Sequence, residues 1–231
     1  MKPISNLQKT KCIMAICLCV SCNSFAAKTD NLIKSGGATT QSVDLISRQL
    51  KVGDVVFIHV TPFPFEKVSF ATRSWVNHVG IVVSCKKGEP IIAESTFPFS
   101  KTTSLSRFIA RSESGRFAAA RLNKPLTEEQ KKAVWSASKK RLGIFYDTGF
   151  NLNSKHQFCS RFVREVLDEA TGENIGKVEN FKTLLASNPD TDLTFWRVWY
   201  FGNIPWERQT VSPASIYNST NLNKVFDGTV I

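Results

Sequence analysis

The chain has 231 residues, 42% of them hydrophobic, which suits one globular domain with a sizeable core. Lys and Arg outnumber Asp and Glu by 30 to 19, which gives a formal net charge of +11. This basic balance favours contact with anionic lipid headgroups or with the anionic envelope of a bacterium. It does not predict a nucleic-acid partner, because no run of Lys and Arg alternates with aromatic residues in a recognisable motif.

Residues 1–26 have the three parts of a secretory signal peptide. A basic start with three lysines precedes an apolar run at 12–20, and Ser24-Phe25-Ala26 is a small-x-small cleavage signal. We therefore expect cleavage after Ala26 and an exported protein, periplasmic or secreted. The apolar run is too short to cross a bilayer, so we expect no transmembrane span in the mature chain.

Cleavage after Ala26 would remove three lysines and no acidic residue, so the net charge would fall from +11 to +8. Four of the six cysteines would leave as well, and Cys85 and Cys159 would remain. Two cysteines are no disulfide framework, although they could bridge in an oxidising compartment. The alternative is a lipoprotein signal with Cys22 as the lipidated residue, but Cys19 stands where a large aliphatic residue is expected.

The first part of the mature chain is predicted to alternate helices and strands. Residues 27–42 are rich in Ala, Lys, Thr, Ser and Gly and predict a flexible leader, so we expect the domain to cover 43–231. His59 has no acidic or Cys neighbour in sequence, and we interpret it as a strand residue. The expected elements are a helix at 43–50, a turn at 51–54, a strand at 55–60, a Pro-containing break at 61–65 and a helix at 66–75.

A β-hairpin is predicted next, from a β-branched strand at 77–85, a turn at 86–88 and a second strand at 91–96. A turn centred there places His78 across from Glu94 or its neighbours, within about 5 Å at Cβ. The carboxylate could then bind one imidazole nitrogen and leave the other to face a thiol. The alternative is an ordinary cross-strand polar pair at a sheet edge.

The second half of the domain is predicted to be mainly helical. Thr127 and Gln130 form a capping box, which opens a helix that Gly143 ends. Residues 195–206 are dense in aromatic side chains whose period fits neither helix nor strand, and they form either core or the wall of an apolar cleft. The other expected elements are a helix at 103–111, a strand at 116–122, a loop at 144–154 with Tyr146 and Asp147, a helix at 180–187 and a last helix at 214–218 after Ser212-Pro213.

Residues 155–172 predict the helix around which we expect the chemistry to be arranged. Six apolar residues from Cys159 to Ala170 recur at helical spacing, and Gly172 is a suitable C-terminal stop. A thiol in the first turn meets the positive end of the helix dipole and unpaired N–H groups, which favour the thiolate. Cys159 is therefore a candidate nucleophile, and the alternative is the first buried residue of a core helix. His156 would need a sharp backbone turn for its ring to reach this sulfur.

Cys159, His78 and Glu94 would supply a nucleophile, a base and an orienting carboxylate. Papain-like enzymes have the Cys-bearing helix before the His-bearing sheet, whereas here the sheet comes first, as in a circularly permuted chain. In this order the motifs resemble the permuted papain-fold, NlpC-type cysteine hydrolases of the YiiX/YebB-like family over residues 48–220. The motifs are Gly53-Asp54, Asn77-His78-Val79-Gly80-Ile81, Ala93-Glu94-Ser95, Tyr146-Asp147, Phe158-Cys159-Ser160 and Ser212-Pro213-Ala214-Ser215. The YebB branch looks closest, through Leu193-Thr194-Phe195-Trp196 and Ile204-Pro205-Trp206-Glu207-Arg208.

The resemblance implies an α+β fold of the circularly permuted papain-like type. In that fold an antiparallel sheet or barrel packs against helices, and the nucleophile lies at a helix N-terminus. The resemblance also implies Cys159 as nucleophile, His78 as base, Glu94 as the orienting residue and Tyr146 as a helper at the oxyanion.

We therefore expect an exported cysteine hydrolase, amidase-like or peptidase-like, that cleaves an amide or ester through an acyl-enzyme on Cys159. Export and basicity favour a peptidoglycan peptide as substrate, whereas the aromatic-rich segment favours an acyl chain on a lipid or lipidated molecule. The alternatives are a catalytically inactive binding domain of the same fold and a lipid acyltransferase. We expect no cofactor and no metal, because neither a Gly-rich phosphate loop nor a metal-ligand spacing is present in the sequence.

Overall fold

The structure of the protein, a computed structural model, describes residues 39–85 and 88–231. The signal peptide predicted at 1–26 and most of the leader predicted at 27–42 lie outside the described residues, and both stay predictions. Thr39–Gln41, at the end of that leader, form the first strand, β1. Regular secondary structure is therefore already present within the predicted leader, before residue 43.

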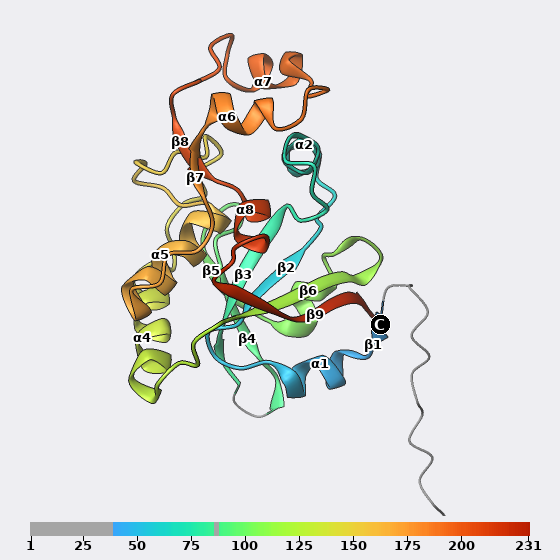
Figure 1. The fold of residues 1–231 in the computed structure, drawn as a ribbon, viewed down its shortest axis with the longest axis vertical. Coiled ribbons are helices and arrows are strands. Elements are labelled where there is room, and N and C mark those ends of the chain that lie inside the picture. Colours follow the sequence, from blue (N-terminus) through green and yellow to red (C-terminus); the bar gives the residue numbers. More distant parts are fainter. Residues whose placement is uncertain (1–38, 86–87) are drawn as a thin grey trace, which may run out of the picture. The chain divides into compact units, whose positions relative to one another are not determined.

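The described residues form a mixed α+β unit with one large and one small sheet (Figure 1). After β1 the strands are β2 (Val55–Ile58), β3 (His78–Ser84), β4 (Ile91–Glu94), β5 (Lys101–Ser104), β6 (Arg116–Leu122), β7 (Val178–Asn180), β8 (Gln209–Val211) and β9 (Leu222–Val230). The helices are α1 (Val43–Gln49), α2 (Phe63–Ala71), α3 (Leu105–Ile109), α4 (Glu128–Lys139), α5 (Cys159–Thr171), α6 (Phe181–Ala186), α7 (Leu193–Trp199) and α8 (Pro213–Tyr217).

The large sheet has the strand order β1-β9-β6-β2-β3-β4-β5, and β7 and β8 form the small one. Neighbouring strands pair antiparallel, apart from the parallel pair of β1 and β9. Because β1 and β5 are the two edges and do not pair with each other, the sheet is open. The α+β prediction is confirmed, and the barrel alternative within it is wrong.

Both faces of the central strands are covered, which explains why β2 and β3 are continuously apolar instead of alternating. On one face, the side chains of Val79 and Ile81 belong to a core that also contains the apolar residues of α4, α5 and α8. On the other face, Val56 and Val82 pack with residues of α1 and α3. A third cluster joins α2 to α6 and α7 around the buried Trp196.

The helix α5 confirms the prediction made for residues 155–172. It begins at Cys159, and its C-cap Gly172 has the left-handed φ of 75° that glycine tolerates without strain. All six of the predicted apolar residues are buried. The same face packs against β3, which brings the helix N-terminus to the end of the strand that carries His78.

Two predicted boundaries are wrong for local reasons. The helix α2 begins at Phe63 instead of 66, because prolines are tolerated in a first turn, where the backbone N–H has no intrahelical acceptor. The helix predicted at 103–111 begins at Leu105, because residues 101–104 pair with β4 as the edge strand β5. The β-branched Thr102 and Thr103 suit that strand.

The strands β7, β8 and β9 were not predicted, and neither was the helical state of 193–199. The strand β9 pairs with β6, about a hundred residues earlier in the chain, and no local pattern reveals such a partner. The helix α7 has an N-cap at Asp192, whose carboxylate accepts hydrogen bonds from the backbone N–H groups of Thr194 and Phe195. This cap was the available signal in a stretch where aromatic residues obscure the period.

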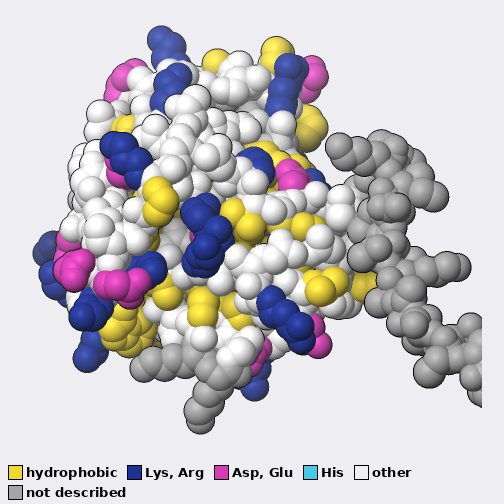
Figure 2. Space-filling model, turned by 60° about the horizontal axis from the view of Figure 1, so that its bottom comes forward, with side chains coloured by type: hydrophobic (Ala, Val, Ile, Leu, Met, Phe, Trp, Pro, Cys, Tyr) yellow, Lys and Arg dark blue, Asp and Glu magenta, His cyan; other side chains and the backbone are white. Residues whose placement is uncertain are grey.

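Charged side chains of both signs are interspersed over the described part of the face in Figure 2. Several form ion pairs at the surface, such as Lys131 with Glu128 and Lys140 with Glu169. Such exposed pairs stabilise a fold by less than about 1 kcal/mol each. Among the described residues, no helix has both the length and the apolar content that a membrane span requires.

The packing of α5 makes a stability prediction. Phe162 is fully buried between α5 and the sheet, so Phe162→Ala should lower the free energy of unfolding by about 3–5 kcal/mol. The matched control is Phe145→Ala, because Phe145 is 62% exposed and its loss should change the free energy by less than about 0.5 kcal/mol. Urea unfolding followed by circular dichroism measures both. Equal stabilities of the two variants would contradict the packing described here.

Candidate active site

Cys159 is the first residue of α5 and lies 3% exposed at the end of β3. Phe158 is the N-cap in an extended conformation, so the chain enters the helix sharply. Phe158 contributes no side-chain cap, and the N–H groups of the first turn have no acceptor within the helix. These donors and the helix dipole act on a thiol that little water reaches.

His78 and Glu94 form the predicted pair across β3 and β4. The Nε2 atom of His78 lies 2.5 Å from Oε2 of Glu94, and both side chains are buried. The strand pairs are Ile81 with Ala93 and Val82 with Ile92, which puts Glu94 opposite Gly80 and makes the contact with His78 diagonal. The predicted contact is present, and the register agrees with the predicted turn at 86–88; within that register Glu94 is the diagonal neighbour of His78. Gly80 suits this arrangement because a Cβ there would lie 2.6 Å from Ile92 and 3.2 Å from Phe108.

Arg111 is a residue of this site that the sequence did not indicate. Its Nη2 donates to both oxygens of Glu94, at 2.8 Å and 2.7 Å, from the turn that follows α3. The Glu94 carboxylate is fully buried, and an unpaired buried charge is costly. Together with His78, Arg111 holds the pKa of Glu94 below its usual value although burial acts in the opposite direction. Arg111 is 33 residues from His78 in sequence, so no local motif joins them.

His78 and Cys159 shift each other's pKa in opposite directions. Burial lowers the pKa of His78, but hydrogen bonds to Cys159 and Glu94, together with their negative charges, outweigh burial and raise the pKa from 6.5 to about 9. Burial raises the pKa of Cys159, and the hydrogen bond and charge of His78 outweigh that effect and lower it. Both shifts favour the form of the pair in which a thiolate lies next to an imidazolium.

Tyr146 also contacts the sulfur. Its hydroxyl donates to Sγ of Cys159 at 3.9 Å, and the backbone N–H of Cys159 lies close enough to the phenol oxygen to lower its pKa. Burial, followed by the nearby charge of Cys159, raises the pKa of Tyr146 well above 10, so the side chain keeps its proton. A protonated phenol and a helix N–H thus converge beside the thiol, as an oxyanion site requires.

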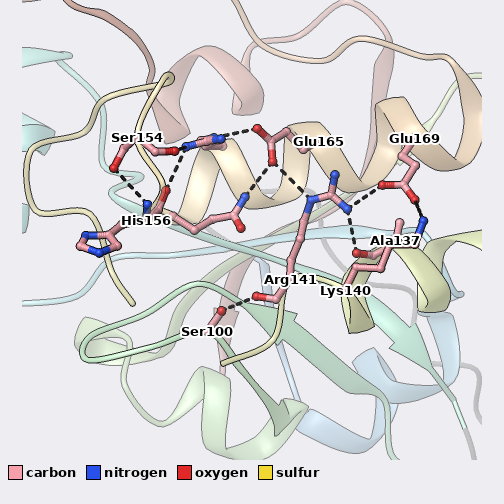
Figure 3. A network of polar contacts seen from close by, with 10 residues as sticks. Ser100, Ala137, Lys140, Arg141, Ser154, His156, Glu165 and Glu169 are labelled. Carbon is pink, nitrogen blue, oxygen red and sulfur yellow. Dashed lines mark hydrogen bonds and ion pairs between the residues drawn. The ribbon is translucent and has the colours of Figure 1, made fainter. Parts of the chain in front are cut away.

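A polar network fixes the segment that leads into α5 (Figure 3). Arg161 donates to the backbone oxygens of Ser154 and His156, at 2.7 Å and 2.9 Å, and its Nε donates to Glu165. Gln157 donates to the same glutamate at 2.8 Å. The backbone oxygen of Gln157 accepts from Ser95, one residue after β4, and from the N–H of Asp147. The network thus holds the start of α5, the end of β4 and the Tyr146 loop in one arrangement.

An apolar pocket adjoins Cys159. The cavity is small, with a volume of about 30 Å³, so a long chain would require its wall to open. Much of the wall comes from α2, α6 and α7, so the aromatic segment 195–206 is partly core and partly cleft wall, as the two alternatives allowed. The main apolar side chains are Phe65, Val68, Phe150, Phe181, Leu184 and Trp196.

The other candidates from the sequence lie outside this arrangement. His156 is exposed beside Phe145, and its ring points away from the polar network in Figure 3. His59 follows β2 and contacts the backbone oxygen of Trp75 and the carboxylate of Glu66. Cys85 is exposed, and it does not bridge Cys159, because both thiols are free.

A buried thiol at a helix N-terminus, faced by a histidine and a carboxylate from a preceding sheet, defines a permuted papain-like thiol hydrolase as the class of protein. The chain belongs to the family described as "Permuted papain-like amidase enzyme, YaeF/YiiX, C92 family", which matches residues 49–226. The family resemblance seen in the sequence is confirmed. At the level of the family, the chain is an amidase-type hydrolase.

Two relatives support this assignment. The protein "Uncharacterized protein YiiX" of Escherichia coli (strain K12) is 29% identical over 184 residues, which cover 80% of this chain and 90% of YiiX. A solved structure, "Crystal structure of metalloprotein yiiX from Escherichia coli O157:H7, DUF1105", is similar with a TM-score of 0.69 at 26% identity. That alignment covers 78% of this chain and 98% of the solved chain. A closer relation to the YebB branch stays a prediction.

Proposed function

We propose that this protein is an exported thiol hydrolase that cleaves an amide or ester bond through an acyl-enzyme on Cys159. The observation that carries the proposal is the buried thiol of Cys159 in the first turn of α5, with the Tyr146 hydroxyl at its sulfur and the buried His78–Glu94 pair close to it, beside an apolar pocket. A thiolate needs a pocket that brings a carbonyl to it and a proton donor for the leaving group. Membership in an amidase family supports the same chemistry.

The reaction would begin with attack of the Cys159 thiolate on the carbonyl carbon. The carbonyl oxygen becomes an oxyanion, which the Cys159 N–H and the Tyr146 hydroxyl stabilise. The C–N or C–O bond then breaks, and the imidazolium of His78 gives its proton to the leaving amine or alcohol. Water next attacks the thioester with His78 as base, which releases the acid and restores the thiolate. Glu94 remains ionised throughout and orients the ring.

The solved structure of YiiX is described as that of a metalloprotein. The donors around Cys159 in this chain do not fit a metal centre. Both oxygens of Glu94 are occupied by Arg111, and one of them also contacts His78. Among residues 39–85 and 88–231, no group of three or more His, Cys, Asp or Glu side chains is placed to hold a metal ion. The proposed mechanism therefore uses the side chains of this chain alone.

The pocket favours an acyl chain as the group that the enzyme transfers to Cys159. Phe181, Leu184 and Trp196 offer apolar surface and few hydrogen-bonding groups, whereas a peptide backbone needs partners for its own N–H and C=O groups. We therefore place a lipid or acyl conjugate ahead of a peptidoglycan peptide. Transfer of the acyl group to an alcohol or amine instead of water would make the protein an acyltransferase.

Mass spectrometry of products tests the proposal. Wild type, Cys159→Ser and the matched control Cys85→Ser are incubated with lipid extracts and with peptidoglycan fragments. We expect new carboxylic acids from the lipid extract with wild type and Cys85→Ser, and none with Cys159→Ser. Products from the peptidoglycan arm alone would overturn the acyl assignment. Equal product patterns from all three proteins would point to the inactive binding domain instead.

The pocket assignment has its own test in chain-length dependence. Leu184 and Leu185 are neighbours on α6, but only Leu184 lies in the wall of this pocket. Leu184→Phe should narrow the pocket and lower kcat/KM for long acyl chains relative to short ones. Leu185→Phe, also in a buried position, is the control for general overpacking. The same chain-length dependence in both variants would contradict an acyl chain in this pocket.

A further inference from the structure

An exposed apolar surface runs from α2 to the end of α7, and we call it the aromatic stripe. It consists of Phe63, Phe195, Val198, Trp199 and Phe201. The rings of Phe63 and Phe195 meet edge to face at 5.4 Å, and Phe195 stacks on Trp199 at 5.6 Å. Val198, Trp199 and Phe201 border one surface hollow. The stripe is therefore continuous between two helices that the sequence separates by more than a hundred residues.

The end of the stripe protrudes into water. Val198 is 74% exposed and Phe201 is 97% exposed. Phe201 also has a φ of 50°, a left-handed conformation that is strained for a bulky residue. A phenylalanine in this conformation buries almost none of its ring in its own fold. The strain and the exposure both point to a contact outside the chain.

Cationic side chains accompany the stripe. The amine of Lys67 lies 5.0 Å from the Phe63 ring and 5.5 Å from the Phe195 ring, and it pairs with Asp192 at 3.2 Å. Arg197 is exposed in the last turn of α7. Arg208 borders the same hollow as Phe201, stacks on Tyr200 at 5.3 Å and donates to a backbone oxygen. Within the described residues, neither arginine forms an ion pair with a carboxylate, although the exposed Glu207 is adjacent to Arg208 in sequence.

We propose that the aromatic stripe docks on the surface of an anionic phospholipid bilayer. Val198 and Phe201 insert among the lipids, and Arg197 and Arg208 contact the phosphates. Protruding apolar side chains flanked by arginines are the composition of interfacial membrane contacts. A protein partner would need a pocket shaped to receive Phe201, whereas a fluid bilayer accommodates a protruding ring without one. Figure 2 shows the molecule turned so that the bottom of Figure 1 comes forward. On the described part of that face, Lys and Arg are interspersed with Asp and Glu, so it is less suited than the stripe to an anionic surface.

The stripe and the pocket beside Cys159 share two helices. Phe65 and Val68 of α2 and Trp196 of α7 line the pocket, while Phe63 and Val198 of the same helices face outward. In Figure 1 both helices lie at the same end of the described unit, beyond the strands of the large sheet. Docking would thus place the pocket next to the membrane surface. The proposal does not require catalysis, and its test uses a protein that cannot form the acyl-enzyme.

The test is co-sedimentation of Cys159→Ser protein with vesicles of phosphatidylcholine alone and of phosphatidylcholine mixed with phosphatidylglycerol. We expect binding to the mixed vesicles, weakened about tenfold or more by Val198→Ser with Phe201→Ser. The matched control is Phe97→Ser, because Phe97 is 70% exposed and lies outside the stripe. This variant should bind the vesicles as tightly as the parent protein. Arg197→Gln should weaken binding to the mixed vesicles severalfold.

All variants carry the same residues 1–38, so the predicted signal segment contributes equally to each. An unchanged thermal unfolding midpoint establishes that the double variant is folded. If its midpoint is lowered, the single variant Val198→Ser is used in the binding measurement instead. Equal binding by the stripe variants and Phe97→Ser would overturn the proposal. Equal binding to the two vesicle types would overturn its electrostatic part. Neither result depends on whether the protein is a hydrolase.

Discussion

Replacing His78 with alanine should lower turnover by about 10⁴-fold, and adding Cys159→Ser should lower it no further. The reason is that the two side chains form one unit. His78 is the main cause that lowers the pKa of Cys159, so this pKa should rise when the imidazole is removed. The leaving group would also lose its proton donor. The measurement is kcat on the substrate identified by the product screen, with wild type and the two single variants alongside.

The matched control for His78→Ala is His156→Ala, which removes the same ring from the segment before α5. His156 is exposed and its ring lies beside Phe145, so its loss should leave kcat unchanged. A large loss with His156→Ala, together with full activity of His78→Ala, would assign the role of base to the wrong histidine. Additive losses in the double variant would show that His78 and Cys159 act separately.

Replacing Glu94 with glutamine should lower turnover by about 10²-fold or more, less than Cys159→Ser, with the double variant no worse than Cys159→Ser alone. Glutamine keeps the shape but removes the charge that raises the pKa of His78. The alkaline limb of the rate profile, near pH 9 in wild type, should therefore move to lower pH. An exposed edge carboxylate would give no such change, and full activity of Glu94→Gln would remove it from the triad.

Arg111→Met tests the same carboxylate from the other side. The pKa of Glu94 should rise when the guanidinium is removed, so part of the negative charge beside His78 is lost and kcat falls by less than in Glu94→Gln. Arg107→Met on α3 is the control, since Arg107 is exposed and does not contact Glu94. If the alkaline limb of the rate profile lies at the same pH in Arg111→Met and in wild type, Arg111 has only a structural role.

The sequence predicted the site well where local rules apply. The helical period, the glycine stop and the position of Cys159 all follow from residues within one helix. The contact between His78 and Glu94 was predicted from an assumed turn at 86–88, and it holds because a glutamate is long enough to reach a diagonal neighbour.

Features that depend on distant pairing could not be predicted. Arg111 reaches Glu94 because β5 and α3 fold back along β4, and no sequence rule connects an arginine after a short helix to a strand end. The strand β9 pairs with β6 in the large sheet, and β6 was predicted whereas β9 was not. No helix was predicted after residue 193, because α7 has apolar residues on both its buried and its exposed faces: Trp196 is buried and Val198 is exposed.

The pH dependence of alkylation at Cys159 tests the central claim most directly, because it needs no substrate. Iodoacetamide modification is followed by mass spectrometry at Cys159 and Cys85 in wild type and His78→Ala. Burial and the charge of Asp54 raise the pKa of Cys85, whereas His78 lowers the pKa of Cys159, so Cys159 should react faster than Cys85 at any pH below the usual pKa of a thiol. In His78→Ala this fast reaction should be lost. Modification of Cys159 should then require a pH near the pKa of an ordinary thiol, about 8.5, or higher. Faster modification of Cys85, or an identical pH profile in His78→Ala, would contradict a thiolate–imidazolium pair.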